Sequence, residues 1–135
     1  MTLLVPNEGE VLLLERFMGK SAAENITLKL FKSNTTPGEG DTTATYTVAD
    51  FSGYADKTLV SATWAAASPG APSSIAYAQQ TWTSDAAQAA QLVYGYYAVG
   101  ATSAKVLWAE RFSDGPYSIA NNGDAIKVTP TVTGD

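Results

Sequence analysis

The chain has 135 residues, 45% of them apolar, which fits one globular domain with a real core and excludes a disordered segment. Its 13 acidic and 8 basic residues give a net charge of −5, so we do not expect it to bind nucleic acid by neutralising phosphates. The chain has neither Cys nor His, which excludes disulfides and thiolate metal sites and removes the commonest general base.

The chain begins with a segment that predicts neither export nor membrane anchoring. Met1–Val5 lacks the basic flank and the long apolar region of a secretory signal. No apolar run approaches the roughly 20 residues that a bilayer span needs. We therefore expect a protein that is made in a cytoplasm and has no membrane partner.

Residues 7–18 are expected to form a helix. Asn7 can serve as its N-cap, and Glu8 and Glu10 would lie in the first turn, where the helix dipole favours negative charge. Gly19 is a natural C-cap. Large apolar residues recur at helical spacing on one face, namely Val11, Leu14, Phe17 and Met18, with Leu13 beside them. We expect this face to cover the open face or an edge of a sheet, with docking into a partner protein as the alternative.

The rest of the chain predicts β structure. Apolar alternation indicates strands over 26–32, 57–63, 75–83, 92–99, 105–112 and 125–132. Pro130 should end the last strand or place it at an edge, and Thr47–Asp50 resembles a capping box that opens a short helical turn. The tail, 131–135, is expected to be frayed or to act as an arm. The prediction is a single domain, 1–135, that is mainly β: a compact β-sandwich or barrel of about six to eight antiparallel strands with one N-terminal helix.

The stretch Thr58–Ala104 has 47 residues and one charged side chain, Asp85. Core packing, contacts between subunits and a platform for stacking sugars each explain its aromatic residues. We expect it to supply the sheet core and much of the subunit contact, while the charged ends, 8–32 and 105–127, meet solvent or a lattice. Its candidate subunit or lattice contacts are Trp64, Trp82, Tyr94, Tyr96 and Tyr97.

Few residues suggest chemistry. Glu110 shares a strand face with Trp108 and Phe112 and could have a raised pKa, but a single carboxylate is not a hydrolase site. The clusters 39–41 and 121–124 offer oxygen atoms to Ca²⁺, yet ordinary turn chemistry explains both. The sequence therefore predicts no catalytic residue, no metal site and no cofactor, and we do not expect an enzyme.

Several segments resemble a family of small structural proteins of tailed bacteriophages, common in aquatic and cyanobacterial phages. The segments are 5–10 (VPNEGE), 12–14 (LLL), 26–34 (ITLKLFKSN), 77–82 (YAQQTW), 93–97 (VYGYY), 107–112 (LWAERF) and 121–128 (NNGDAIKV). The resemblance implies a virion component that is synthesised in the host cytoplasm. The expected role is a capsid decoration (cement) protein, a homotrimer that binds the major capsid protein on the outer head surface and stabilises capsomer contacts. The alternative is a tail, baseplate or fibre-associated protein that binds carbohydrate.

Overall fold

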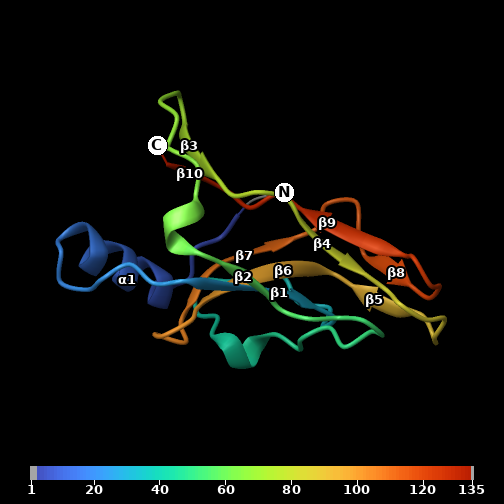
Figure 1. Ribbon diagram of the computed structural model, residues 1–135. Coiled ribbons are helices and arrows are strands. Elements are labelled where there is room, and N and C mark those ends of the chain that lie inside the picture. The colour runs from blue at the N-terminus through green and yellow to red at the C-terminus, as the bar shows by residue number, and fades with distance from the viewer. Residues whose placement is uncertain (1–2, 135) are drawn as a thin grey trace.

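The computed structural model describes residues 3–134, which are mainly β, as predicted (Figure 1). Two short 3₁₀ turns, η1 (Thr43–Thr45) and η2 (Ser61–Thr63), lie between strands. The helix and the strands are α1 (Asn7–Phe17), β1 (Ile26–Phe31), β2 (Lys57–Leu59), β3 (Ser73–Ala76), β4 (Gln80–Thr83), β5 (Gln91–Val93), β6 (Gly95–Gly100), β7 (Val106–Arg111), β8 (Tyr117–Ile119), β9 (Ala125–Val128) and β10 (Thr131–Gly134).

The central layer is an antiparallel sheet of four strands in the order β2-β1-β6-β7. The two-stranded ladders β4-β9 and β5-β8 lie over one face of this sheet, and the loop that carries η1 lies on the other side (Figure 1). A third ladder, β3-β10, projects from the layers. The strands form an open, sandwich-like stack rather than a closed barrel.

The core fills both sides of the central sheet. In β1 the predicted alternation is confirmed, because Leu28 and Leu30 are fully buried in the cluster between the sheet and the ladders. Trp82 lies in the same cluster and is 1% exposed, and its Nε1 donates a hydrogen bond to the Ala55 carbonyl at 2.9 Å. On the other side, the rings of Tyr46 and Tyr97 stack with centroids 4.6 Å apart. Each face of the sheet is therefore covered by the chain itself.

Three predicted strands are each divided in the structure. The range 75–83 separates into β3 and β4, which pair with different strands, and 92–99 separates into β5 and β6. The range 125–132 breaks at Pro130, as its missing N–H predicts, into β9 and β10. Each division lets one run of sequence serve two ladders, which is why more strands form than apolar alternation alone indicates.

One of the two alternatives for the tail and the prediction for Thr47–Asp50 were wrong. The tail is paired rather than frayed, since Thr131–Gly134 forms β10 against β3, while the arm alternative stays a prediction; residue 135 lies outside the described residues. Thr47–Asp50 opens no helical turn, because Val48 pairs with Phe31 in an extended conformation. The helical turn lies a few residues earlier, at η1, where Thr45 Oγ1 accepts a hydrogen bond from the backbone N–H of Thr42 at 3.1 Å.

Candidate interaction surface

Helix α1 is held against the edge of β7 by close and polar contacts. Gly9 is buried there, and a Cβ at this position would lie 2.7 Å from the carbonyl oxygens of both Val106 and Leu107. Glu8 Oε1 accepts a hydrogen bond from the Val106 backbone N–H at 2.6 Å. These contacts tie the first turn of the helix directly to the backbone of β7.

The far end of α1 is fixed by an ion pair between Arg16 and Glu24. Glu24 also accepts hydrogen bonds from the backbone N–H groups of Thr102 and Ser103, at 2.6 and 2.8 Å. Burial raises the pKa of Glu24, but the Ser103 and Thr102 hydrogen bonds and the Arg16 charge outweigh it, so its pKa lies below the usual 4.5. The ionised carboxylate therefore fixes the orientation of α1.

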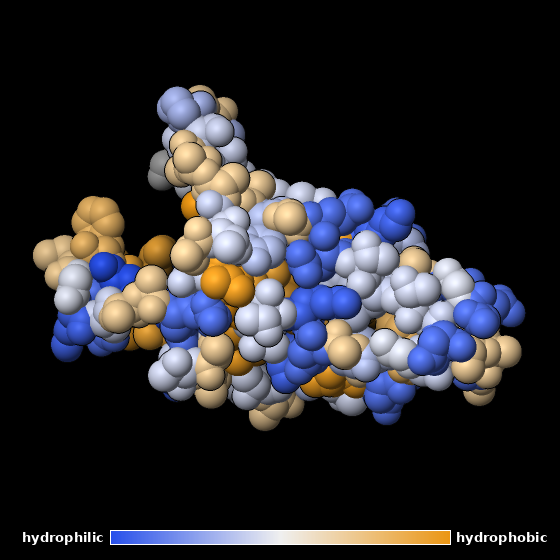
Figure 2. Space-filling view, in the orientation of Figure 1, coloured by the Kyte–Doolittle hydropathy of each residue, from blue (hydrophilic) through white to orange (hydrophobic). Residues whose placement is uncertain are grey.

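The apolar face of α1 points away from the protein. We call it the α1 face, and the exposed fractions of its residues are Val11 56%, Leu13 63%, Leu14 64%, Phe17 87% and Met18 76%. Only two other large apolar residues among the described ones, Val60 and Leu92, are comparably exposed, at 39% and 42%. Figure 2 shows apolar side chains at the left end of the molecule, over α1. The expectation that this face covers the sheet was therefore wrong.

The orientation of α1 follows from which residues can approach β7. Gly9 leaves the room for the two backbones to meet, and Glu8 and Arg16 find their partners on the same side. These contacts turn the wide apolar stripe outward. A glycine inside a helical segment, such as Gly9, is the sequence signal that could have indicated this close backbone approach.

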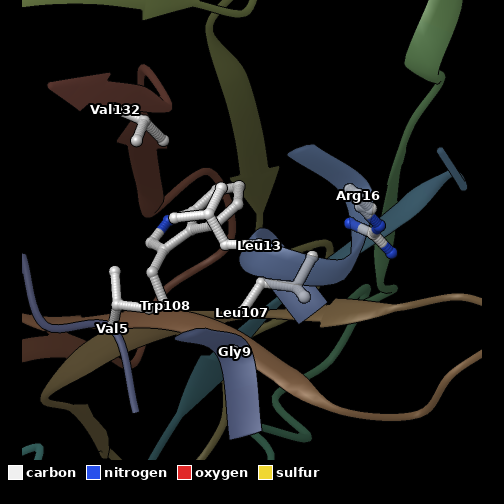
Figure 3. A pocket seen from close by; sticks show the side chains of 7 residues that line it. All are labelled: Val5, Gly9, Leu13, Arg16, Leu107, Trp108 and Val132. Carbon is white, nitrogen blue, oxygen red and sulfur yellow. The ribbon is translucent and has the colours of Figure 1, made fainter. Parts of the chain in front are cut away.

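A groove, which we call the α1 groove, runs between α1, β7 and β10 (Figure 3). Its cavity is about 140 Å³, and most of its lining is apolar: Val5, Gly9, Leu13, Leu107, Trp108 and Val132. Beyond Val132 the groove opens into a wider pocket of about 300 Å³ that Trp64, Ile75 and Glu24 help to line. The α1 face thus lies beside a largely apolar recess on the same end of the molecule.

The groove also holds buried polar atoms without partners. Among the described residues, the atoms Arg16 Nε, Ser21 Oγ and Trp108 Nε1 are buried and make no hydrogen bond of good geometry. The Tyr96 hydroxyl, which donates its own hydrogen bond to Glu110, lies near the Trp108 indole and can accept from it, so it is the geometry that leaves Nε1 unpaired. Buried polar atoms are usually paired. Arg16 and Trp108 line the α1 groove, whereas Ser21 lines a separate pocket between the end of α1 and residues 102–103.

The five aromatic candidates separate into two groups. Trp82, Tyr96 and Tyr97 are buried in the core, 1%, 3% and 2% exposed, so the described surface does not present them to a partner. Tyr94 is half-buried, and the Arg111 guanidinium lies over its ring, 5.0 Å from the centroid.

Trp64 is the one candidate that reaches the pocket beside the α1 groove. Its ring meets those of Tyr77 and Trp108 edge to face, with centroids 5.2 and 6.1 Å away. The neutral stretch therefore supplies core residues, as expected. The largest exposed apolar surface lies instead in 8–32, a charged end that we had expected to meet solvent or a lattice.

The acidic candidates have structural partners. Glu110 accepts a hydrogen bond from the Tyr96 hydroxyl, and burial together with that bond raises the pKa of Tyr96 well above its usual 10. Asp41 accepts from the Gly38 N–H at 2.8 Å and from the Tyr46 hydroxyl at 2.6 Å. Asp124 accepts from the N–H groups of residues 120 and 121, as turn chemistry predicts. Within residues 3–134, no group of three or more metal-ligating side chains is placed to hold an ion.

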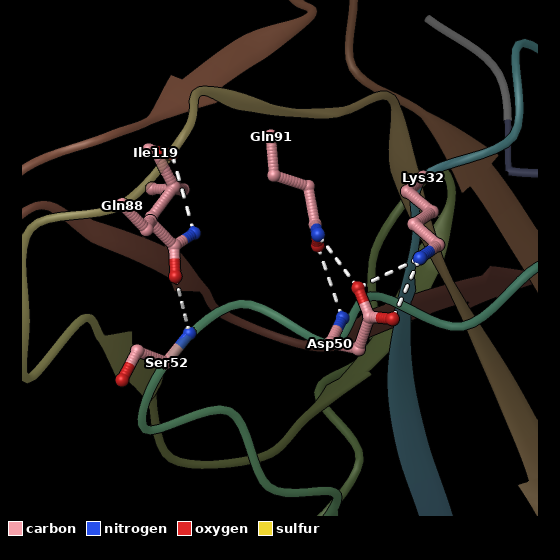
Figure 4. Close-up of polar contacts among 6 residues, drawn as sticks. All are labelled: Lys32, Asp50, Ser52, Gln88, Gln91 and Ile119. Carbon is pink, nitrogen blue, oxygen red and sulfur yellow. Dashed lines mark hydrogen bonds and ion pairs between the residues drawn. The ribbon is translucent and has the colours of Figure 1, made fainter.

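A second polar cluster fastens the loop after η1 to β1 and β5 (Figure 4). The Asp50 carboxylate accepts hydrogen bonds from Lys32 Nζ at 2.7 Å and from Gln91 Nε2 at 2.6 Å, and these bonds lower its pKa. The side-chain carbonyl of Gln88 accepts from the Ser52 N–H at 2.6 Å. Every polar group drawn in Figure 4 binds another part of the same chain, so this cluster stabilises the fold.

No protein family, no characterised protein and no solved structure matched the chain. Over residues 3–134, no helix is both long and apolar enough to cross a bilayer. The feature of the molecule that is most informative about function is the outward α1 face beside the α1 groove.

Proposed function

We propose that this protein is a virion structural protein, a capsid decoration (cement) protein of a tailed phage, and that the α1 face is a protein–protein contact. The observation that carries the proposal is the orientation of α1, whose polar and glycine contacts fix the helix while its apolar stripe stays outside. The resemblance of the sequence to phage structural proteins supplies the biological setting. The acidic residues considered for chemistry, Glu110, Asp41 and Asp124, bind groups of the same fold, which fits an assembly role.

The size of the α1 face is appropriate for a contact between proteins. Full burial of a large apolar side chain contributes roughly 1.5–3 kcal/mol, so covering its five partly exposed residues contributes about 5–10 kcal/mol before costs. Association costs about 4–15 kcal/mol in lost freedom. The face alone is therefore marginal, and a stable contact needs the adjoining groove or symmetry-related copies as well.

A protein is a better partner for this face than a membrane. Helices that lie in a membrane surface carry Lys and Arg on the polar side, where they meet anionic lipid. Helix α1 carries Glu8, Glu10 and Glu15 instead, in a chain whose net charge is −5. These charges disfavour an anionic surface and leave a protein face as the chemically matched partner.

The location of the protein in the assembled particle tests the proposal. We expect gold-labelled antibody against the chain to bind the heads of phage particles and heads lacking the chain to lose DNA at a lower temperature. Label confined to the tail would overturn the capsid role in favour of the tail or baseplate alternative. Glycan binding that disappears in Trp64→Ala but persists in Phe17→Ser would instead favour the fibre-associated, carbohydrate-binding alternative.

A further inference from the structure

We infer that the occupant of the α1 face is the α1 face of a second copy of this chain, packed antiparallel about Leu14. This inference deepens the proposed function and rests on its claim that the face is a protein contact. The apolar residues run from Val11 to Met18, so Leu14 lies near the middle of the stripe and points outward, 64% exposed. A two-fold axis there makes the same patch serve both partners.

The charges beside the stripe favour an antiparallel pair. Glu10 is exposed near the N-terminal end of the helix. Just beyond the C-terminal end, the Lys20 side chain is 78% exposed and its Nζ lies 3.8 Å from Glu15 Oε1 of the same chain, a loose pair that leaves Lys20 open to a second carboxylate. Antiparallel packing brings Glu10 of one copy toward Lys20 of the other and sets the two helix dipoles in opposition, both of which are favourable. A parallel bundle around a three-fold axis would instead gather like charges at each end.

Pairing through α1 keeps the β layers of the two copies apart. Helix α1 lies at one end of the molecule, away from the ladders β4-β9 and β5-β8 (Figure 1). Contacts of α1 with its own chain involve Glu8, Gly9, Leu12 and Arg16, which lie on the opposite side of the helix from Leu14. Two copies can therefore meet through their helices without disturbing those contacts. A trimer, which stays a prediction, would have to use a different surface.

Cysteine cross-linking tests this geometry, because the natural chain has no Cys. Under mild oxidation, we expect purified Leu14→Cys to form a disulfide-linked dimer with itself. In an antiparallel pair about Leu14, position 11 faces position 17, so Val11→Cys should cross-link at least 5-fold faster to Phe17→Cys than to another Val11→Cys. The matched control is Leu92→Cys, an exposed apolar site on β5 that should stay monomeric.

The outcomes separate the alternatives. A Leu14→Cys protein that stays monomeric would overturn the inference. A Val11→Cys protein that cross-links with itself as fast as with Phe17→Cys would overturn the antiparallel arrangement and indicate a parallel bundle. If the natural chain also sediments as a monomer at micromolar concentration, the face must meet another protein, such as the major capsid protein.

Exchanging the charges of Glu10 and Lys20 tests the pairing independently of folding. A loss of monomer stability would not be reversed by the second substitution. We expect Glu10→Lys to weaken dimerisation about 3-fold or more and the double variant Glu10→Lys, Lys20→Glu to restore it, as measured by sedimentation equilibrium at low salt. Equal weakening in the single and double variants would overturn the pairing of these charges. All of these measurements use purified protein. A failure of dimerisation through α1 is therefore distinguishable from a failure of the proposed capsid role, which is tested in the virion.

Discussion

The layered body and the helix at its end place their large apolar side chains in opposite ways. In the body, Trp82, Leu28 and Leu30 are buried between sheets, and polar groups tie the loops down around them. In α1, the polar residues Glu8 and Arg16 face the protein, and most of the apolar ones are exposed, although Leu12 packs against the core. The contrast is that the body buries its own large apolar side chains, whereas α1 leaves most of its apolar side chains exposed, and the proposed contact rests on this difference.

The largest effect should come from the core of the body. Trp82→Ala removes a fully buried ring and the hydrogen bond of its Nε1 to Ala55, so we expect a loss of about 3–5 kcal/mol in the free energy of unfolding. Urea denaturation measures this loss. The half-buried Trp64 of the groove provides the comparison, and Trp64→Ala should cost clearly less. Equal losses would mean that body and groove are packed to the same degree.

The next effect concerns the contact between helix and body. Gly9→Ala would improve helix propensity by about 0.8–1 kcal/mol if the site were open. Because its Cβ would lie 2.7 Å from two carbonyl oxygens of β7, we expect a net destabilisation of about 1–3 kcal/mol. Gly40→Ala, whose Cβ would meet nothing within 4 Å, is the control. A stabilised Gly9→Ala would show that α1 is not held as described.

A smaller effect depends on pH. The pKa of Glu24 is lower in the folded protein than its usual 4.5, so the unfolded chain binds the proton more readily. The stabilisation is therefore complete above about pH 4.5 and is lost as the pH falls through the folded pKa. We expect Glu24→Gln to lose about 1–2 kcal/mol at pH 7 and to show a flatter pH dependence in acid. Parallel pH curves for the two proteins would contradict this role.

The smallest effect on stability should come from the α1 face itself. Leu14→Ser changes an exposed side chain, so the free energy of unfolding of the monomer should change by no more than about 0.5 kcal/mol, as measured at high dilution. A loss above 2 kcal/mol would mean that Leu14 packs against its own chain. The same variant should weaken association, which separates the function of the face from its contribution to folding.

The sequence predicted local structure well and the orientation of the helix poorly. The helix was predicted over 7–18 and observed over Asn7–Phe17, with Gly19 just beyond it at a φ of +72°. Periodicity places apolar residues on one face but does not say what that face meets. The answer here depends on Val106, which lies 98 residues from Glu8, and on Glu24, which is close to Arg16 in sequence but is itself fixed by residues 102 and 103.

The prediction of strands was limited in the same way, because alternation within a segment does not say which segment it pairs with. Alternation identified β1 and β7 almost to the residue, because each is a continuous strand of the central sheet. It missed β8 and the pairing of β10 with β3, since neither short segment has enough alternation to stand out. Of the five aromatic candidates, the pattern could not separate buried Trp82 from Trp64 at the groove, because both lie among small neutral residues.

The attachment of α1 to β7 has a consequence for the order of events during synthesis. The helix leaves the ribosome about 90 residues before its docking strand, which at 5–20 residues per second is an interval of about 5–20 s. During that interval the apolar stripe is already made, while the backbone that will receive Gly9 is not. Nascent chains on neighbouring ribosomes of one message thus carry this undocked apolar segment at high local concentration. The proposed pairing of two copies through α1 can therefore begin before either body is finished.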